Sequence, residues 1–513
     1  MRAAGDYLVP HLNGHLYTQK PPLLFWSIAA ASLPFGQVTE TAARLPSAFA
    51  AIGACLLVFR IGERLFSRRA AWIAALAFAT SARILWQGRF GQIDMLLTGL
   101  VTLAVWFWVR AWTEERPALA LGFFACAGVA NLAKGPVGLL PPLFGILAFL
   151  LATRRWEDVR RLRLGRSLAL WAGVGLLWLV PAAFHAGPEY LREIALKQTV
   201  TRYAEPWHHF QPPWYYLKTI PIDFFPWTLL LPSALVIGWR RLEGRARDGF
   251  LFAFCWFAAT VVFFSLSAAK REVYVLSMFP ALALMTGAAL DRIAADWPRD
   301  RKWLQVPLAI LALLAAALPV ALWSAGHGRP EAVPLGGDRF VALATAALAL
   351  LALGAIAAWW QARSGRAFAA ASWLAAGMAG LALAAAFLLL PAFDAVKSAR
   401  QLSRVLVSRA APGEPYAIYP RLDPTFLFYT ERFAAEPASE AELQAFARRP
   451  ERVWVLVERD TLARLREPLP LAEIARDADP LEGYVLFGPR DGGRPWQPVP
   501  VSPAGPAPAR RAP

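Results

Sequence analysis

The chain has 513 residues, of which 57% are hydrophobic and only 17% are charged, and its formal net charge is +17. Soluble domains carry about 25% charged residues, and the apolar residues here form blocks too long for a soluble core. A nucleic-acid partner is not expected, because the basic residues fall in short loops between apolar blocks rather than on one soluble face. Their placement fits membrane topology and contacts with anionic membrane lipids.

Twelve apolar segments follow one another along the chain. A bilayer core of about 30 Å needs about 20 apolar residues per helix. Only Lys134-Gly135-Pro136 separates the fourth segment from the fifth, which leaves open one broken hairpin in place of two spans. The sequence predicts an α-helical integral membrane protein with about twelve transmembrane helices, at 44–66, 70–88, 93–112, 118–133, 136–152, 167–186, 223–239, 249–268, 273–291, 303–325, 339–360 and 368–390.

Basic residues occur in alternate loops between these segments. The loop 153–166 carries six arginines, and the loops 239–248 and 291–302 carry four Arg or Lys residues each. Since loops rich in Lys and Arg stay in the cytoplasm, the long loop 187–222 is expected on the opposite, periplasmic face. The first 43 residues and the chain after residue 391 are expected there too. Either the short N-terminus crosses the membrane unaided, or an additional span upstream of Met1 carries the first loop across, and we favour the second.

The chain changes character after the last apolar segment. Residues 394–493 contain an amphipathic helix, DAVKSARQLSRVLVSRA, a further helical stretch, ASEAELQAFARR, and the strand-like runs PYAIYP, RVWVLVE and GYVLFG. This alternation predicts a small periplasmic α/β domain. Residues 1–393 form the predicted membrane domain, and the Pro/Ala-rich tail 494–513 is expected to be disordered.

Three polar clusters lie where predicted spans meet the periplasmic face, a depth at which polar groups are costly and usually functional. Lys20, before two prolines, is either a phosphate contact or a lysine that snorkels to the interface. Asp94 is either a base or orienting carboxylate in an external site or a helix N-cap. Lys134 either lines a cavity at a helix break or closes a hairpin turn.

A fourth cluster is the loop 201–216, TRYAEPWHHFQPPWYY. His208, His209 and Glu205 could bind a divalent metal, but adjacent histidines rarely share one ion and no HxH or HxxxH spacing is present. An interfacial aromatic belt is the alternative for this loop. The three cysteines all fall in apolar blocks, so they do not indicate a zinc site or a disulfide framework.

The fifth cluster, Lys270, Arg271 and Tyr274, is the one most typical of a phosphate site, since arginine binds phosphate in a bidentate manner and tyrosine adds a donor. Together with Lys20, Lys134 and Arg202 it places cations on the face that should be poor in charge. Their convergence predicts that an anionic group binds at the outer membrane surface. A lipid phosphate is the anion that fits this position best.

Six motifs occur in order along the chain: GDYLVPHLNGHLYTQKPPLLFW, RLPSAFAA, RFGQIDMLLT, AKGPVGLLPPL, TRY…HHF…PWYY and KREVYVLSMFPALAL. Together they resemble the lipid-carrier-dependent glycosyltransferases of the GT-C superfamily. The aminoarabinose transferases that modify lipid A are the most similar branch, and protein mannosyltransferases are more distant. The resemblance runs from residue 1 to about residue 490.

The resemblance implies transfer of a sugar, with inversion, from a polyprenyl (undecaprenyl) phosphate carrier to an envelope acceptor such as lipid A at the periplasmic face of the inner membrane. It implies that Lys20 is the carrier-phosphate lysine, that Arg202 and Tyr274 add phosphate contacts, and that Asp94 and Lys134 line the cavity. Candidate contacts to the acceptor or within the loops are Tyr17, Tyr203, His208 and His209.

The chain departs from the family in two places. The family has a first transmembrane helix and then a loop with an Asp-Glu pair upstream of the GDY segment, and neither is in this sequence. We therefore expect Met1 to be internal to a protein of thirteen spans, whose principal catalytic carboxylate lies upstream. Gln19 stands where the aminoarabinose transferases tend to carry Glu, which weakens a metal role there and the assignment to that sugar.

The leading hypothesis is thus a glycosyltransferase. A transporter or flippase for a lipid-linked saccharide would show internal repeats and charged residues at mid-membrane, whereas the charges here cluster at helix ends. A non-catalytic envelope assembly protein is the third hypothesis. The sequence leaves open the sugar, the acceptor, which is a lipid or a protein, the need for a divalent metal and the oligomeric state.

Overall fold

A computed structural model describes residues 1, 5–194, 210–327, 337–477 and 483–490 of the chain. The chain divides into two compact units. The first comprises residues 1–11, 16–324 and 344–383, and the second comprises residues 12–15, 325–343 and 384–513.

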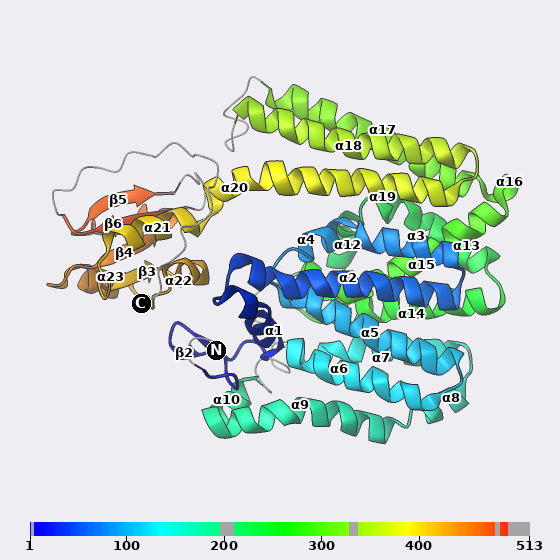
Figure 1. Cartoon of the computed structure of the whole chain (residues 1–513), viewed down its shortest axis with the longest axis horizontal. Helices are drawn as coiled ribbons and strands as arrows, with labels where there is room; N and C mark the ends of the chain where they lie inside the picture. Colours follow the sequence, from blue (N-terminus) through cyan, green and yellow to red (C-terminus); the bar gives the residue numbers. More distant parts are fainter. Residues whose placement is uncertain (2–4, 195–209, 328–336, 478–482, 491–513) are drawn as a thin grey trace. The chain divides into compact units, whose positions relative to one another are not determined.

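The first unit is a bundle of long helices that lie side by side (Figure 1). Short 3-10 segments connect or extend them: η1 (Leu33–Phe35), η2 (Pro117–Leu119), η3 (Gly135–Gly138), η5 (Trp227–Leu230) and η6 (Glu272–Met278). The helices are α1 (Leu23–Ala31), α2 (Glu40–Leu65), α3 (Arg68–Ala79), α4 (Ala82–Gln87), α5 (Ile93–Thr113), α6 (Ala120–Lys134), α7 (Leu140–Ala152), α8 (Trp156–Arg161), α9 (Leu164–Ala186), α10 (Pro188–Leu191), α12 (Tyr215–Asp223), α13 (Leu231–Arg241), α14 (Gly244–Leu266), α15 (Phe279–Ala295), α16 (Trp297–Asp300), α17 (Lys302–Gly326), α18 (Gly337–Arg363) and α19 (Ala367–Ala384).

Nine helices within the described residues are long and apolar enough to cross a membrane. The chain is therefore a multi-pass membrane protein, as its sequence predicts. The nine are Glu40–Leu65, Ile93–Thr113, Pro117–Gly138, Leu164–Ala186, Gly244–Leu266, Glu272–Ala295, Lys302–Gly326, Gly337–Arg363 and Ala367–Ala392. Each overlaps one of the predicted spans.

The predicted count of twelve is not confirmed, because three of the predicted spans are broken or short. The segment at 70–88 is divided between α3 and α4, which are 12 and 6 residues long. The segment at 136–152 gives α7, a helix of 13 residues. The segment at 223–239 belongs to a pair of helices bent by 110°, Tyr215–Asp223 and Trp227–Arg241, which would add a tenth span if the pair crosses as one.

The helix α15 forms the centre of the bundle. In an apolar stretch of 18 residues of the span that contains α15, 94% of the residues are buried. The corresponding share is 22% in the spans of α9 and α17. The helix α15 packs against α3 so closely that a Cβ atom on Gly287 would lie 2.4 Å from the carbonyl oxygen of Ala70. Small residues allow such close approach where helices associate within lipid.

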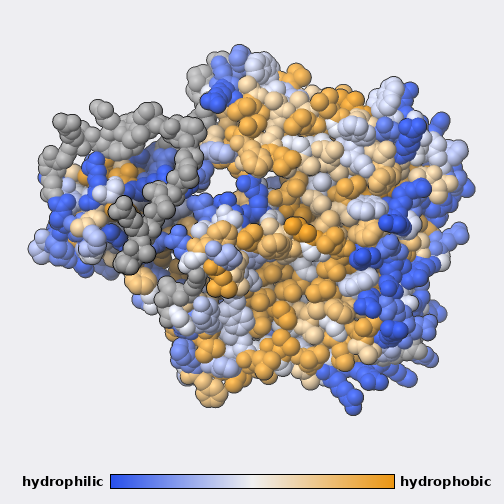
Figure 2. Space-filling view, viewed as in Figure 1, coloured by the Kyte–Doolittle hydropathy of each residue, from blue (hydrophilic) through white to orange (hydrophobic). Residues whose placement is uncertain are grey.

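The surface of the bundle separates into an apolar part and a charged end. Figure 2 shows hydrophobic residues along the helices and a hydrophilic border at the end where α16 lies. This arginine-rich end is formed by the loops 153–166, 239–248 and 291–302. The helix α5 begins, and α6 ends, at the opposite end of the bundle (Figure 1).

The second unit contains a four-stranded sheet in the order β3-β4-β6-β5, in which only β3 and β4 pair in parallel. The predicted amphipathic helix and the three predicted strands are confirmed as α21, β3, β4 and β6. The elements are η8 (π-helix, Ala385–Leu389), α20 (Leu390–Lys397), α21 (Ala399–Arg409), β3 (Tyr416–Tyr419), α22 (Pro424–Thr430), α23 (Glu440–Ala447), β4 (Trp454–Glu458), α24 (Arg459–Leu462), β5 (Ala472–Arg476) and β6 (Tyr484–Gly488).

Both faces of this sheet are covered. Leu456 of β4 packs with Leu402 of α21 in one apolar cluster, and Val455 packs with Leu443 of α23 in another. Successive residues of a strand point to opposite faces, so the apolar run WVLV of β4 serves both clusters. The predicted α/β character of this region is confirmed. The tail 494–513 lies outside the described residues.

Asn13, in the turn between β1 (His11–Leu12) and β2 (His15–Leu16), belongs to the second unit and is hydrogen-bonded to other residues of that unit. Its amide donates to the carbonyl oxygen of Ala434 (2.8 Å) and to the Glu436 carboxylate (2.5 Å), and its oxygen accepts from the Ala434 N–H (2.9 Å). The side chain therefore pairs with one backbone unit as a neighbouring strand would.

Cysteine labelling tests the predicted topology. In a chain whose three native cysteines are changed to alanine, Arg160→Cys lies in the arginine-rich loop 153–166 and Phe433→Cys lies at an exposed position of the second unit. An impermeant thiol reagent added to intact cells should label the cysteine at 433 and leave the one at 160 unreacted until the cells are lysed. The reverse pattern would overturn the orientation.

Candidate functional site

Asp94 and Lys134 form an ion pair where α5 begins and α6 ends. The Lys134 Nζ atom lies 2.5 Å from Asp94 Oδ1, and the two side chains are only 11% and 10% exposed. The pair joins two of the sequence motifs, RFGQID and AKGP. A buried charge without a partner is costly, so each of these side chains fixes the other.

Local structure explains why both charges are tolerated here. Asp94 lies in the first turn of α5, and Lys134 is the last residue of α6. Carboxylates are stabilised near the positive N-terminus of a helix, and cations near the negative C-terminus. Gly135 follows Lys134 with a φ of +77°, a backbone conformation that favours glycine and ends the helix. The helix break predicted at Lys134-Gly135-Pro136 is confirmed.

Tyr274 covers this ion pair. Its ring lies in η6, and the Lys134 Nζ atom is 4.3 Å from the ring centroid. A cation over an aromatic face is attracted by the ring quadrupole. Tyr274 is held in turn by Phe264 of α14, at 5.7 Å between ring centroids. A third motif, KREVY, therefore meets the first two at Lys134.

The neighbouring cations Lys270 and Arg271 have different environments. Lys270 is buried, and its ammonium donates to the carbonyl oxygens of Ser267 (2.5 Å) and Gln211 (3.0 Å). Burial lowers the pKa of this lysine. An ammonium has three donors, so one is left for a further acceptor. The Arg271 side chain is exposed, and its carbonyl oxygen accepts a hydrogen bond from Tyr216 Oη (3.4 Å).

The segment with Lys20 lies directly before α1, which packs against both α2 and α6. Lys20 is half-buried. Its neighbours are fixed: the Tyr17 ring meets Phe25 edge-on at 5.8 Å, and the Thr18 hydroxyl donates to Glu193 (3.1 Å). The lysine is thus presented from an ordered turn at the end of the bundle where α6 ends (Figure 1).

Several predicted site residues lie outside the described residues: Arg202, Tyr203, Glu205, His208 and His209. Among the residues that the structure does describe, no group of three or more His, Cys, Asp or Glu side chains is arranged to hold a metal ion. The weak metal prediction for this loop stays a prediction.

Two polar contacts near the same end of the bundle were not predicted from the sequence. Arg83 of α4 donates through Nε (2.9 Å) and Nη2 (2.6 Å) to Asp223 of α12, whose other carboxylate oxygen is buried and has no hydrogen-bond partner among the described residues. The two residues are 140 positions apart in the chain. In the sequence, the aspartate lies between two prolines in an apolar segment, PIDFFP, and this is the feature that could have indicated a buried charge there.

The second is Asp6, in the GDY motif. Its carboxylate accepts from the N–H groups of Leu8 (2.9 Å) and Val9 (3.3 Å) and lies 3.3 Å from His185 Nε2. Burial alone would raise the pKa of Asp6, but the Val9 and Leu8 N–H groups and then His185 outweigh it and lower that pKa. Asp6 thus holds the turn of the first motif and contacts His185 of α9.

The chain is similar in sequence to known glycosyltransferases. The family model for dolichyl-phosphate-mannose-protein mannosyltransferases matches residues 19–183. The undecaprenyl phosphate-alpha-4-amino-4-deoxy-L-arabinose arabinosyl transferase of Edwardsiella ictaluri is 30% identical over 305 residues, and that of Pectobacterium carotovorum is 31% identical over 335 residues. These matches cover 58% and 63% of this chain but only 54% and 59% of the relatives, less than two thirds of their length.

The crystal structure of ArnT from Cupriavidus metallidurans bound to undecaprenyl phosphate superposes with a TM-score of 0.78, over 95% of this chain and 91% of that one, at 22% sequence identity. The chain has the ArnT fold. The resemblance to aminoarabinose transferases that the motifs indicate is confirmed by these relatives, and the similarity of fold covers 95% of the chain.

The Asp94–Lys134 pair can be tested by its contribution to stability. Asp94→Asn or Lys134→Met alone leaves a buried charge unpaired and should lower the free energy of unfolding by about 3–5 kcal/mol. The double variant should lose clearly less free energy of unfolding than the two single variants together. The reason is that each single change leaves the other charge buried without a partner, whereas the double change removes both charges. Unfolding of the purified protein in detergent measures all three.

Arg60 and Glu63 provide the matched control, since their side chains are 63% and 38% exposed and pair at 3.3 Å. The same cycle there should give a coupling below about 1 kcal/mol. Equal coupling energies for the two pairs would show that Asp94 and Lys134 are not held as a buried unit.

Proposed function

We propose that this chain transfers a sugar from a polyprenyl (undecaprenyl) phosphate carrier to an envelope acceptor such as lipid A, with inversion. The observation that carries the proposal is the buried Asp94–Lys134 pair beneath Tyr274, which brings three of the sequence motifs to one point. The names of the similar relatives describe arabinosyl transferases that use an undecaprenyl phosphate donor, and the ArnT neighbour was crystallised with undecaprenyl phosphate.

Lys134 is the residue that fits a carrier phosphate best. One of its three N–H donors is bound by Asp94, and the Tyr274 ring attracts the ammonium from another side. A remaining donor is free to meet a phosphate oxygen. Held in this way, the ammonium stabilises the charge that grows on the phosphate as the sugar leaves, without reorganising during the reaction.

Asp94 acts as an orienting group in this scheme rather than as a free base. Its Oδ1 atom already accepts a hydrogen bond from the Lys134 ammonium at 2.5 Å. It therefore directs Lys134 toward the carrier phosphate. Lys20, Lys270, Arg271 and Tyr274, with Arg202 from the loop outside the described residues, supply further contacts to the carrier phosphate.

The setting of the reaction is also part of the proposal. The alternation of basic loops supports an inner-membrane location with the Asp94 end of the bundle and the second unit on the periplasmic side. There the donor lipid and a lipid or protein acceptor are both accessible from the membrane. Tyr17, Tyr203, His208 and His209 are proposed to contact the acceptor or shape the loop around it, and dependence on a divalent metal is left open.

A transfer assay tests the function. The full-length product of the gene, purified in detergent, is incubated with a radiolabelled undecaprenyl-phosphate sugar and lipid A, and labelled lipid A is counted. Transfer that depends on the protein is expected. Binding or translocation of the donor without any transfer to lipid A, another glycolipid or protein would support a transporter instead and overturn the proposal.

Lys20→Ala gives the residue-level test. Loss of one charge-assisted hydrogen bond to the carrier should raise the KM for the donor by about 10- to 100-fold, whereas Lys20→Arg should keep much of the activity. Lys218→Ala, which removes an exposed lysine on α12, is the matched control and should behave as wild type. Unchanged kinetics in Lys20→Ala would remove Lys20 from the phosphate site.

A further inference from the structure

A pocket of about 430 Å³ lies at the arginine-rich end of the bundle, between the ends of α13 and α16 and the start of α17. It is lined by four cations, Arg240, Arg241, Arg299 and Lys302, and by one acid, Asp300. The pocket is far from the Asp94–Lys134 pair, since α5 begins and α6 ends at the other end of the bundle (Figure 1).

Only one of these four cations is balanced within the pocket. Arg241 donates to Asp300 at 3.3 Å, and Asp300 is buried. The side chains of Arg240, Arg299 and Lys302 are exposed, and no acidic partner is found for them among the residues that the structure describes. Three like charges around one hollow repel each other, and a bound anion would relieve that repulsion.

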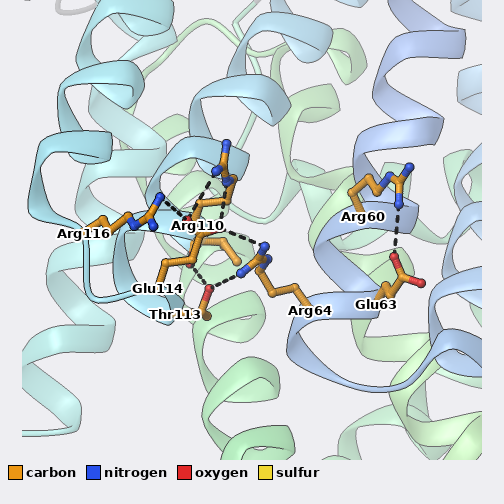
Figure 3. Close-up of polar contacts among 8 residues, drawn as sticks. Arg60, Glu63, Arg64, Arg110, Thr113, Glu114 and Arg116 are labelled. Atoms are coloured by element: carbon orange, nitrogen blue, oxygen red, sulfur yellow. Dashed lines mark hydrogen bonds and ion pairs between the residues drawn. The ribbon is translucent and has the colours of Figure 1, made fainter.

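A second group of arginines at the same end is neutralised by acidic side chains. Figure 3 shows Arg64, Arg110 and Arg116 directed at Glu114, at 2.8, 2.9 and 4.0 Å, with the neighbouring pair Arg60–Glu63 beside them. Basic residues placed only to set membrane topology can be neutralised in this way. The pocket of α13, α16 and α17 has positive charge that is left over.

The pocket also has an apolar side. Val236 and Ile237 of α13 and the Trp303 ring of α17 line it beside the cations, and Lys302 Nζ lies 5.9 Å from the Trp303 ring. Tryptophan is enriched at the level of lipid headgroups, and basic pockets between membrane helices bind anionic headgroups. A free phosphate ion would make no favourable contact with this apolar side of the pocket.

We propose that this pocket binds the headgroup of an anionic glycerophospholipid, with the phosphate on Arg240, Arg299 and Lys302 and the adjoining glycerol against Val236, Ile237 and Trp303. The lipid links α13 to α16 and α17, so its binding stabilises the folded bundle. The proposal concerns a different site from the sugar transfer and does not depend on that function.

Lipid binding to the purified full chain in a neutral detergent tests the proposal. Native mass spectrometry counts the bound molecules while dioctanoyl phosphatidylglycerol, dioctanoyl phosphatidylcholine or glycerol 1-phosphate is titrated. One phosphatidylglycerol should bind preferentially and raise the melting temperature, and added salt should weaken it. The triple variant Arg240→Gln/Arg299→Gln/Lys302→Gln should bind on the order of 100-fold more weakly, about fivefold for each residue removed.

The matched control, Arg116→Gln/Arg160→Gln/Arg166→Gln, removes the same charge from exposed positions at the same end of the bundle. It should bind phosphatidylglycerol within about twofold of wild type. If the triple pocket variant does not fold, Lys302→Gln alone at its exposed position gives the same test with about a fivefold loss.

Three results would overturn the proposal. Equal losses in the pocket variant and the control would mean that only the general surface charge matters. Equal binding of phosphatidylcholine would mean that the anionic charge is not recognised. Binding of glycerol 1-phosphate as tightly as phosphatidylglycerol would mean a site for a soluble phosphate rather than for a lipid.

Discussion

The buried ion pair between Asp94 and Lys134 is the point at which three of the sequence motifs meet. Charged side chains at membrane depth are stable only when a partner of opposite sign meets them with good geometry. Asp94 and Lys134 meet this condition because one helix begins and the next one ends at the same point, and each charge lies at the helix terminus that favours it. The aromatic ring of Tyr274 completes the arrangement. The pair therefore fixes how α5, α6 and η6 come together, and the proposed chemistry uses a lysine whose position is already determined.

Charge is distributed unevenly between the two ends of the bundle, and this pattern connects topology with function. The arginine-rich end carries many cations, and some of them are paired with acids or stacked on tryptophans, as around Glu114. The other end carries fewer cations. There Lys270 is buried and held by carbonyl oxygens, and Lys134 is held by a carboxylate and an aromatic ring. Positive charge at the first end is what membrane insertion requires. At the second end positive charge does not serve insertion, and we propose that it binds an anionic ligand.

Much of this could be predicted from the sequence, and the exceptions have physical causes. Spans such as Ile93–Thr113 were identified because an apolar run of about 20 residues needs no tertiary information. The break between α3 and α4 and the bend between α12 and η5 depend on packing and lay hidden in continuous apolar runs. The edge strand β5 was missed because its sequence, AEIAR, lacks the apolar run of the other strands, and only one of its five residues is buried. The candidates Asp94, Lys134 and Tyr274 were named one by one, but no rule of spacing could show that they touch, and Arg83 with Asp223 was invisible for the same reason.

The central claim is that Lys134, oriented by Asp94 and Tyr274, holds the phosphate of a polyprenyl carrier. An electron cryomicroscopy structure of the full-length protein with undecaprenyl phosphate tests it most directly. The phosphate should lie within hydrogen-bonding distance of Lys134 Nζ, with the contact between Lys134 and Asp94 retained. A phosphate bound at another place on the bundle, or an Asp94 side chain that leaves Lys134 when the carrier binds, would contradict the claim.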